Sequence, residues 1–295
     1  MAQPVYQIRL FERELDEIVN VASVPQRSPF RYPGGKTWLV PRIRQWLATL
    51  NVNEFIEPFA GGAIISLTVA AEKLAKHVTM VERDDQVAAV WKTIIEDDQG
   101  EWLANRITSF DLTPESLKEA LEKKPRSVRE KAFQTILKNR TYHGGILAAG
   151  SAPFKYGENG RGVKSRWYPE TLKKRVLAIT PMRPRITFIE GDGIETTRCN
   201  ATLRAAAFFI DPPYTAAGKK AGSRLYTHSK LDHHELFKVV ATVNGDFLMT
   251  YDDTYEVRTL AQRHGFDTEL VAMKNTHHAE MTELLIGRNL DWARS

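Results

Sequence analysis

Short apolar runs, each closed by a polar or charged residue, alternate along the chain with segments whose apolar positions have helical spacing. Runs of this kind are typical of strands buried on both faces of a parallel sheet. They predict strands at 54–57, 77–82, 186–191, 206–211, 246–251, 268–273 and 282–287. Amphipathic helices are expected at 63–75, 85–95 and 232–243. The alternation predicts an α/β, doubly wound domain with a mostly parallel sheet.

Two parts of the chain depart from this alternation. Only a loop, "KNTHHAEM", separates the last two strands, so they are expected to pair antiparallel. Residues 101–185 lack comparable strand patterns and contain helical ones at 113–124 and 127–140, with Thr113 as a cap. We therefore predict an N-terminal arm (1–27), one domain built from 28–100 and 186–295, and an inserted, mainly helical domain at 101–185.

The composition is that of an ordinary soluble globular protein, with 42% hydrophobic and 26% charged residues. Cys199 is the only cysteine, which excludes an intrachain disulfide and zinc sites built on cysteine clusters. No apolar segment is long enough to span a bilayer, and the N-terminus does not resemble a secretory signal. We expect a cytoplasmic protein without a membrane partner.

The positive charge is concentrated in one segment. The chain has a net charge of +5, yet residues 131–185 hold twelve Lys or Arg against two Glu, so the remainder is net negative. Tyrosines, Phe154, Trp167 and many glycines are interleaved with these basic residues. Such a mixture favours a nucleic-acid-binding loop, because aromatic rings stack on bases and glycines allow close approach. A solvated basic face is the alternative.

Acidic residues or glycines follow three of the predicted strands. In "AAAFFIDPPY" (205–214), Asp211 and Tyr214 stand on either side of two rigid prolines. The segment "EFIEPFAGGA" (54–63) is a strand followed by a glycine-rich turn, and in "HVTMVERD" (77–84) the strand ends at Glu82. Ligands of open α/β sheets bind outside the carboxyl ends of the strands, and a carboxylate after the second strand is where such folds hold ribose hydroxyls. A strand followed by a proline turn is the plainer interpretation of the first segment taken alone.

Taken together, these motifs resemble the Dam-type adenine-specific DNA methyltransferases of bacteria and phages, which use S-adenosylmethionine. The matching segments, in family order, are "RYPGGKTWLVPRI", "FIEPFAGGA", the acidic strand end at Glu82 and "DPPY". Looser matches are "LKNRTYHGG", "EGDGIE" and "AEMTELLI", and the resemblance covers residues 28–287. Glu82 stands where the family usually has Asp, and Ala63 where many relatives have a third glycine, which leaves the affinity for the cofactor open.

The resemblance implies a Rossmann-like class I methyltransferase fold with a DNA-recognition insert. It also implies a pocket for S-adenosylmethionine formed by Tyr32, Gly34, Gly35, Lys36, Glu57, Pro58, Phe59, Ala60, Gly61, Gly62, Glu82, Arg83, Asp192, Gly193, Ile194 and Asp211. In this scheme the turn at 57–62 wraps the methionine end, Glu82 binds the ribose hydroxyls, and Asp192 accepts from the adenine amino group of the cofactor. Lys36 either pairs with the methionine carboxylate or lies near the target base.

The catalytic residues implied are Asp211, Pro212, Pro213 and Tyr214. The exocyclic amino group of adenine is a poor nucleophile because its lone pair is delocalised into the ring. The carboxylate of Asp211 and the carbonyl of Pro212 would accept its N–H groups and aim the lone pair at the methyl group. Tyr214 would stack on a base flipped out of the duplex.

The expected partner is double-stranded DNA, and the implied contact residues are Asn139, Arg140, Tyr142, His143, Lys155, Tyr156, Arg161, Lys164, Arg166 and Trp167. Of these, Arg140 is the side chain expected to reach a base edge. No metal site is expected, because the histidine pairs in "LDHHEL" and "NTHHAE" are adjacent and point apart on a helix.

Two rival functions remain open at this point. One is methylation of an RNA base or a protein amide, because an acid-Pro-Pro-Tyr segment suits any planar amino group. The other is a catalytically silent DNA-binding module on the same scaffold. The recognised DNA sequence, the existence of a cognate restriction endonuclease and the oligomeric state are also open.

Overall fold

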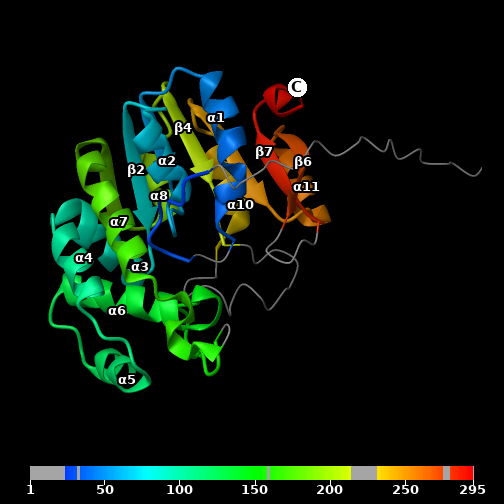
Figure 1. The fold of residues 1–295 in the computed structure, drawn as a ribbon. Coiled ribbons are helices and arrows are strands. Elements are labelled where there is room, and N and C mark those ends of the chain that lie inside the picture. Colours follow the sequence, from blue (N-terminus) through cyan, green and yellow to red (C-terminus); the bar gives the residue numbers. More distant parts are fainter. Residues whose placement is uncertain (1–23, 32–33, 158–159, 214–230, 275–279, 295) are drawn as a thin grey trace, which may run out of the picture.

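A mixed sheet of seven strands lies at the centre of the protein (Figure 1). The computed structural model describes residues 24–31, 34–157, 160–213, 231–274 and 280–294. The strands are β1 (Glu54–Glu57), β2 (His77–Glu82), β3 (Ile186–Glu190), β4 (Ala206–Ile210), β5 (Asp246–Tyr251), β6 (Asp267–Lys274) and β7 (Glu280–Gly287). Their order is β3-β2-β1-β4-β5-β7-β6, and only β7 runs antiparallel to its neighbours β5 and β6.

This arrangement confirms the predicted seven-stranded, mostly parallel sheet with an antiparallel pair at its C-terminal end. The apolar runs located the first five strands to within a residue. β6 and β7 extend further toward one another than predicted, because polar residues such as Lys274 and Glu280 also pair in this ladder.

Helices connect the strands, and four of those named next begin at a residue whose side chain caps the helix. They are α1 (Val40–Ala48), α2 (Ile64–Glu72), α3 (Asp85–Trp91), α8 (Gly193–Cys199), α10 (His233–Val240) and α11 (Tyr255–Arg263), with 3-10 turns η2 (Lys36–Leu39) and η9 (Asp291–Ala293). The helix predicted at 85–95 is α-helical only to Trp91 and continues as a π-helical turn, η3 (Lys92–Glu96). Side chains of Asp84, Asp192 and Asp232 cap α3, α8 and α10.

Alternate residues of each strand face two separate layers of helices. Phe55, Phe209 and Leu285 pack in a hydrophobic cluster that includes residues of α1, α2 and α3. Their sequence neighbours, such as Phe208, face the opposite way and pack with α10 and α11. Side chains on a strand alternate between its faces, so the sheet is covered on both sides and its strands read as continuous apolar runs. Strands covered in this way accommodate polar groups mainly at their ends.

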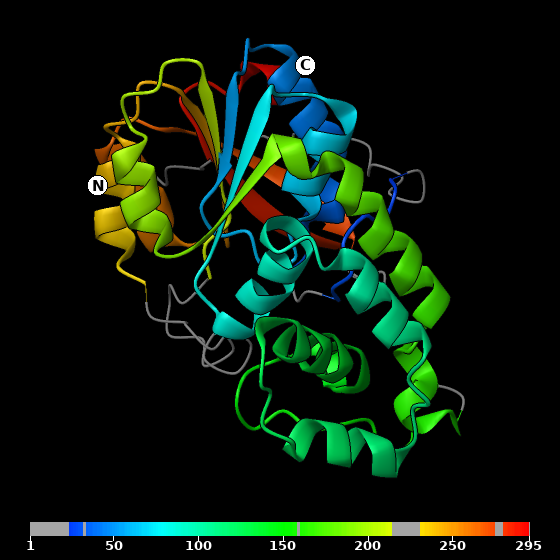
Figure 2. The same cartoon turned by 90° about the vertical axis from the view of Figure 1, so that its left-hand side faces the viewer.

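The insert is helical; its lower part lies beyond the carboxyl ends of the parallel strands, and its last helix runs back alongside the sheet (Figures 1 and 2). Its elements are α4 (Gly100–Thr108), α5 (Pro114–Glu122), α6 (Val128–Thr141), η4 (His143–Gly145), η6 (Gly162–Arg166), α7 (Pro169–Ile179) and η7 (Thr180–Arg185). Thr113 caps α5 in a capping box with Ser116, as its sequence predicted. Buried residues of the insert belong to the same cluster as those of α1 to α3. The division into domains stays a prediction.

No helix within the described ranges has both the length and the apolar character that crossing a membrane requires.

Candidate active site

Four of the predicted site segments lie side by side at one edge of the sheet. Asp192 follows β3, Glu82 ends β2, Glu57 ends β1, and Asp211 follows β4. Because β3, β2, β1 and β4 are consecutive parallel neighbours, their carboxyl ends meet at the same edge. The topology therefore brings together acidic residues that are far apart in sequence.

The glycine-rich turn after β1 is held at several points. The Ala60 N–H donates to the Val81 carbonyl at 2.8 Å, and the indole Nε1 of Trp91 donates to the Gly61 carbonyl at 2.9 Å. Gly61 has a φ of 48°, which glycine adopts without steric cost. Ala63, at the start of α2, has a φ of 52°, where a side chain is strained. The missing third glycine therefore falls at a position whose backbone favours glycine.

Glu57 is directed into the protein from the end of β1. Its Oε2 accepts from the Ser66 N–H at 2.9 Å, in the first turn of α2, and the residue is buried. Burial raises the pKa of Glu57 to about 8, and the nearby carboxylates of Asp211 and Glu82 add to the shift. This carboxyl group therefore connects the end of β1 to the first turn of α2.

Glu82 is surrounded by backbone donors. Its Oε2 accepts from the Gly61 N–H at 2.9 Å, and its Oε1 accepts from the N–H groups of Arg83 and Asp84, both at 2.7 Å. Burial raises the pKa of Glu82 to about 7, although the three backbone donors act in the opposite direction. Asp84, the nearest other acid, caps α3 through the N–H groups of Gln86 and Val87. Glu82 is therefore the carboxylate that joins the ends of β1 and β2.

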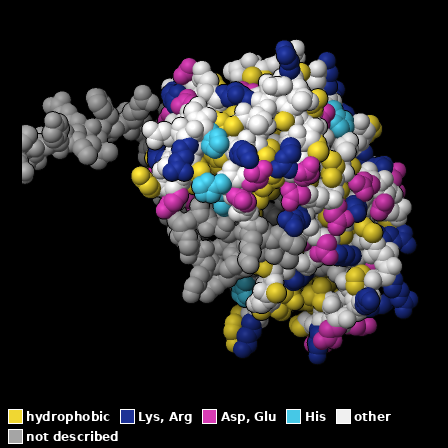
Figure 3. Space-filling model, turned by 180° about the vertical axis from the view of Figure 1, so that it is seen from behind, with side chains coloured by type: hydrophobic (Ala, Val, Ile, Leu, Met, Phe, Trp, Pro, Cys, Tyr) yellow, Lys and Arg dark blue, Asp and Glu magenta, His cyan; other side chains and the backbone are white. Residues whose placement is uncertain are grey.

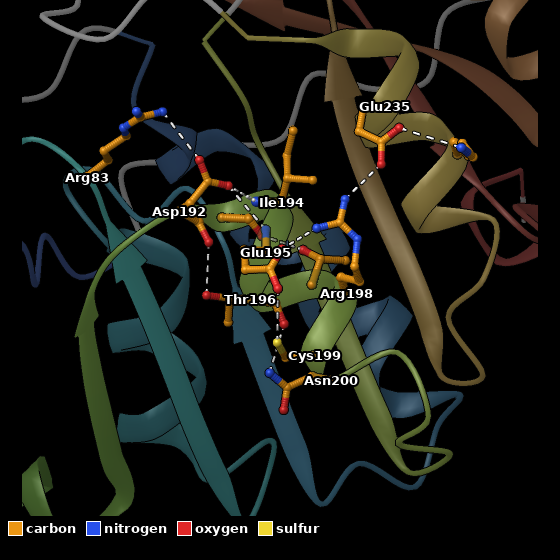
Figure 4. A network of polar contacts seen from close by, with 12 residues as sticks. Arg83, Asp192, Ile194, Glu195, Thr196, Arg198, Cys199, Asn200 and Glu235 are labelled. Atoms are coloured by element: carbon orange, nitrogen blue, oxygen red, sulfur yellow. Dashed lines mark hydrogen bonds and ion pairs between the residues drawn. The ribbon is translucent and has the colours of Figure 1, made fainter.

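Asp192 caps α8 and also reaches across to the β2 end (Figure 4). Its Oδ1 accepts from the N–H groups of Ile194 and Glu195 at 2.9 and 3.1 Å, and its Oδ2 lies 3.3 Å from Nη1 of Arg83. Gly193 sits so close to the glycine-rich turn that an added Cβ would lie 2.2 Å from the Pro58 carbonyl oxygen. The beginning of α8 therefore packs directly against the turn after β1, with no space for a side chain at position 193.

Asp211 is held by side chains from two other elements. Thr250, on β5, donates its hydroxyl to Asp211 Oδ1 at 2.8 Å, and the Lys36 ammonium lies 2.9 Å from the same oxygen. Lys36 also lies 3.1 Å from Oε1 of Glu283, on β7, and donates to the Gly34 carbonyl at 3.0 Å. Lys36 thus lies next to the acid at the end of β4, and its expected partner, the methionine carboxylate or the target base, stays a prediction.

Lys36 is cationic in this environment. Its side chain is only 5% exposed. Burial alone would lower its pKa, but the carboxylates of Asp211 and Glu283 outweigh that effect and raise the pKa above the ordinary value. A permanently protonated ammonium cannot accept a proton, so Lys36 acts on its neighbours through its charge.

Thr250 and Glu283 were missed in the sequence. Both stand in strands whose sequences are mostly apolar. Both also lie on the sheet face of Asp211, because Asp211, Thr250 and Glu283 each stand two residues from a member of one hydrophobic cluster, namely Phe209, Leu248 and Leu285. A glutamate at an inward position of a buried strand, as in "TELLIG", was the available signal. Glu283 is 3% exposed, so its place among buried leucines required a partner.

The predicted DNA-contacting residues fall into an inward and an outward group. Asn139 is buried and clamps the backbone of Arg31, donating to its carbonyl and accepting from its N–H, both at 2.8 Å. Arg140 is buried and donates to the Pro29 carbonyl, with burial lowering its pKa to about 9. Trp167 is buried and meets Phe110 edge to face. The Arg140 guanidinium thus binds the backbone of the segment that precedes Lys36, and its contact with a base edge stays a prediction.

The outward group lies on the loops that follow α6. Its exposed members are His143, Lys155, Tyr156, Arg161 and Lys164, while Tyr142 and Arg166 are partly buried. The Tyr156 residue is 72% exposed and its ring lies 5.3 Å from the Lys155 ammonium. Figure 3 shows exposed hydrophobic side chains next to Lys and Arg in this lower part of the molecule. This surface combines rings and positive charge as the sequence predicted for the loop.

Of the other predicted site residues, the two prolines lie beside Asp211. Tyr32 and Tyr214 lie outside the described residues. Pro212 is buried and Pro213 is partly buried beside Asp211. Within the part of the chain that the structure describes, no group of three or more His, Cys, Asp or Glu side chains is arranged to hold a metal ion.

Comparisons with known proteins identify a family and many solved structures of low sequence identity. The sequence profile of the D12 class N6 adenine-specific DNA methyltransferases matches residues 32–276. A precorrin-6y C5,15-methyltransferase from Geobacter metallireducens GS-15 is 11% identical, with 85% of this chain and 86% of that one covered and a TM-score of 0.35. The rRNA methyltransferase aviRa from Streptomyces viridochromogenes is 12% identical, with 87% and 86% covered and a TM-score of 0.36. A search of curated proteins returned no match.

Proposed function

The chain belongs to the D12 class N6 adenine-specific DNA methyltransferases, and from that premise we propose that it transfers the methyl group of S-adenosylmethionine to the 6-amino group of adenine in a specific site of duplex DNA. The base is flipped out of the helix, and transfer is direct, without a covalent enzyme intermediate. One observation carries this proposal: Asp211 lies at the end of β4, next to the ends of the strands that carry the nucleotide-binding motifs, and its carboxylate is oriented by Lys36 and Thr250.

The residues at the strand ends fit S-adenosylmethionine. Gly61, in the turn after β1, has a positive φ and no side chain, so a ligand can approach the backbone closely there, and Gly193 leaves no room for a side chain against Pro58. Glu82 would hold the ribose hydroxyls, and Asp192 with Ile194 would hold the adenine ring of the cofactor. Glu57 and the turn at 58–62 would surround the methionine end. When bound, S-adenosylmethionine supplies an electrophilic methyl group on a sulfonium.

Asp211 prepares the target nitrogen. Its carboxylate accepts an N–H of the amino group, the Pro212 carbonyl accepts the other, and the lone pair is thereby directed out of the ring. The carboxylate also stabilises positive charge that develops on the nitrogen as the new bond forms. Tyr214 stacks on the flipped base, which contributes about 1–3 kcal/mol and offsets part of the cost of unstacking.

The exposed basic and aromatic side chains of the insert bind the DNA. Lys155, Arg161 and Lys164 are exposed and available to phosphates, while the exposed ring of Tyr156 can stack on a base. The loops after α6 lie on the side of the sheet where the parallel strands end (Figure 1), and Asp211 follows β4 at that edge, so we expect a duplex bound to these loops to approach Asp211.

Single-molecule sequencing tests the proposal directly. The protein is expressed in cells that lack adenine methylation, and modified bases are scored by sequence context, with Asp211→Ala as the matched control. We expect methylated adenine in one context with the wild type and none with the variant. Modified cytosine, an equal signal from the variant, or unmodified DNA would each contradict the proposed function.

A further inference from the structure

The Lys36 ammonium is shared between two acids. It lies 2.9 Å from Asp211 Oδ1 and 3.1 Å from Glu283 Oε1, and it donates to the Gly34 carbonyl at 3.0 Å. An ammonium has three N–H donors, and two carboxylates and a carbonyl oxygen lie within hydrogen-bonding distance of this one. Lys36 and Glu283 are both almost fully buried, with side chains 5% and 4% exposed. Removing one partner of such a buried contact therefore costs more than breaking a surface ion pair, because it leaves the other charge buried and unpaired.

Glu283 reaches this position because β7 is antiparallel. The parallel strands β4 and β5 deliver their carboxyl ends to the site, whereas β7 delivers residues near its start. Glu283 shares a sheet face with Leu285, which packs in the same cluster as Phe209 of β4. A carboxylate is costly at such a position, and an apolar residue would continue the pattern. This cost calls for a role that an apolar residue could not serve.

The second acid changes the electrostatics at Asp211. If Lys36 paired with Asp211 alone, the ammonium would cancel most of the negative charge that the reacting nitrogen requires. Glu283, on the other side of the ammonium, offsets that cation, so the three ionised side chains together keep a net negative charge. In a buried site such charges act over short distances with little screening.

We propose that Glu283 is a positioning residue for methyl transfer, acting through Lys36: it holds the ammonium in the geometry that orients Asp211 and balances its charge so that Asp211 remains an effective anion. This inference rests on the proposed function. It assigns a chemical role to an acid outside the four strand ends that carry the recognisable motifs.

The first test is the single-turnover rate of methyl transfer with Glu283→Gln, which keeps the shape of the side chain and removes its charge. We expect a rate loss of about ten- to a hundredfold, with dissociation constants for S-adenosylmethionine and DNA changed by less than about threefold. Glu283→Asp, which keeps the charge, should recover part of the rate. Glu269→Gln is the matched control, because Glu269 is a strand glutamate paired with Arg294 away from the site.

The second test is a double-mutant cycle with Lys36→Met. If Glu283 acts through Lys36, Glu283→Gln changes the rate much less in the Lys36→Met protein than in the wild type. A wild-type rate for Glu283→Gln overturns the inference. An equal loss in both backgrounds also overturns it, because Glu283 would then act independently of Lys36 or only on the fold. Failure of the wild type to methylate DNA would instead refute the proposed function, so the two failures are distinguishable.

Discussion

The edge of the sheet and the helical insert use charged residues in different ways. At the sheet edge, the acids that the motifs singled out converge on one place, and Glu57, Glu82, Asp192 and Asp211 all lie at strand ends. In the insert, at least seven of the twelve basic residues of 131–185 bind the protein itself. These include Lys131 on Asp85, Lys138 on Leu147, Arg140 on Pro29, Lys164 on Asp111, Arg175 on Ser28, Arg183 on Ile95 and Arg185 on Ala75.

The difference shows what net charge reveals about a segment. A basic composition indicates attraction to nucleic acid, but it does not show which cations are available at the surface. Asn139, Arg140 and Arg175 bind the backbone of residues 28–31, which runs toward Lys36. The insert therefore holds the backbone of residues 28–31 with part of its polar side chains and presents another part to solvent.

The largest effect is expected at the sheet edge. Asp211→Ala removes both the acceptor for the amino group and the charge that stabilises the transition state, so the single-turnover rate should fall by about a hundred- to a thousandfold. Cofactor binding by calorimetry should change little. A variant that retains more than about a tenth of the wild-type rate would show that Asp211 is not the aligning acid.

The next effect concerns the cofactor and pH. Glu82→Gln removes a charged acceptor from the ribose hydroxyls and should weaken S-adenosylmethionine binding about ten- to a hundredfold. Since burial raises the pKa of Glu82 to about 7, its carboxylate is present above that pH and lost below it. Wild-type affinity should therefore fall about tenfold between pH 8 and pH 6.

Calorimetry at both pH values checks this expectation. Burial also raises the pKa of Glu57, and the Glu82→Gln variant separates the two groups because its affinity should depend much less on pH. The same pH dependence in variant and wild type would assign the titration to another group.

A matched pair of variants in the insert tests the division into inward and outward cations. Arg140→Ala leaves the Pro29 carbonyl without its buried donor and should lower the free energy of unfolding by about 1–3 kcal/mol. Lys155→Ala removes an exposed charge and should leave stability unchanged while it weakens DNA binding and reduces the salt dependence. Urea denaturation and DNA titrations at two salt concentrations measure both.

This pair also revises the expected role of Arg140. A buried Arg140 should affect a cognate site and a one-base variant alike, since it acts through the fold. A selective loss of affinity for the cognate site, with unchanged stability, would restore it as a reader of base edges.

The smallest effect is expected at the turn after β1. Ala63→Gly replaces a strained residue with one that accepts a φ of 52° and is also better at a helix start. The gain should be about 0.5–1 kcal/mol in the free energy of unfolding, because part of it is offset by the greater entropy of glycine in the unfolded chain. A loss of stability would mean that the Ala63 methyl group packs more favourably than the strain costs.

The sequence revealed the strands and the acids at their ends for a physical reason. Buried parallel strands must be continuously apolar, so a carboxylate such as Glu82 or Asp211 marks both the end of a strand and the position of a ligand. Contacts between distant segments were not visible. The pairing of Lys36 with Glu283 depends on the order of β4, β5 and β7, and the burial of Arg140 depends on carbonyls of residues 28–31.

The central claim is that the Asp211 site methylates adenine in DNA. The most direct measurement is mass spectrometry of the methylated products. The protein and isotopically labelled S-adenosylmethionine are incubated in three separate reactions with adenine-unmethylated duplex DNA, with RNA of the same sequences, and with a peptide mixture, and the label is then located in nucleosides or peptides. We expect labelled N6-methyladenine in the duplex DNA alone, and we expect this label to be lost with Asp211→Ala. Label in cytosine, in RNA or in peptide, or an undiminished signal from Asp211→Ala, would contradict it.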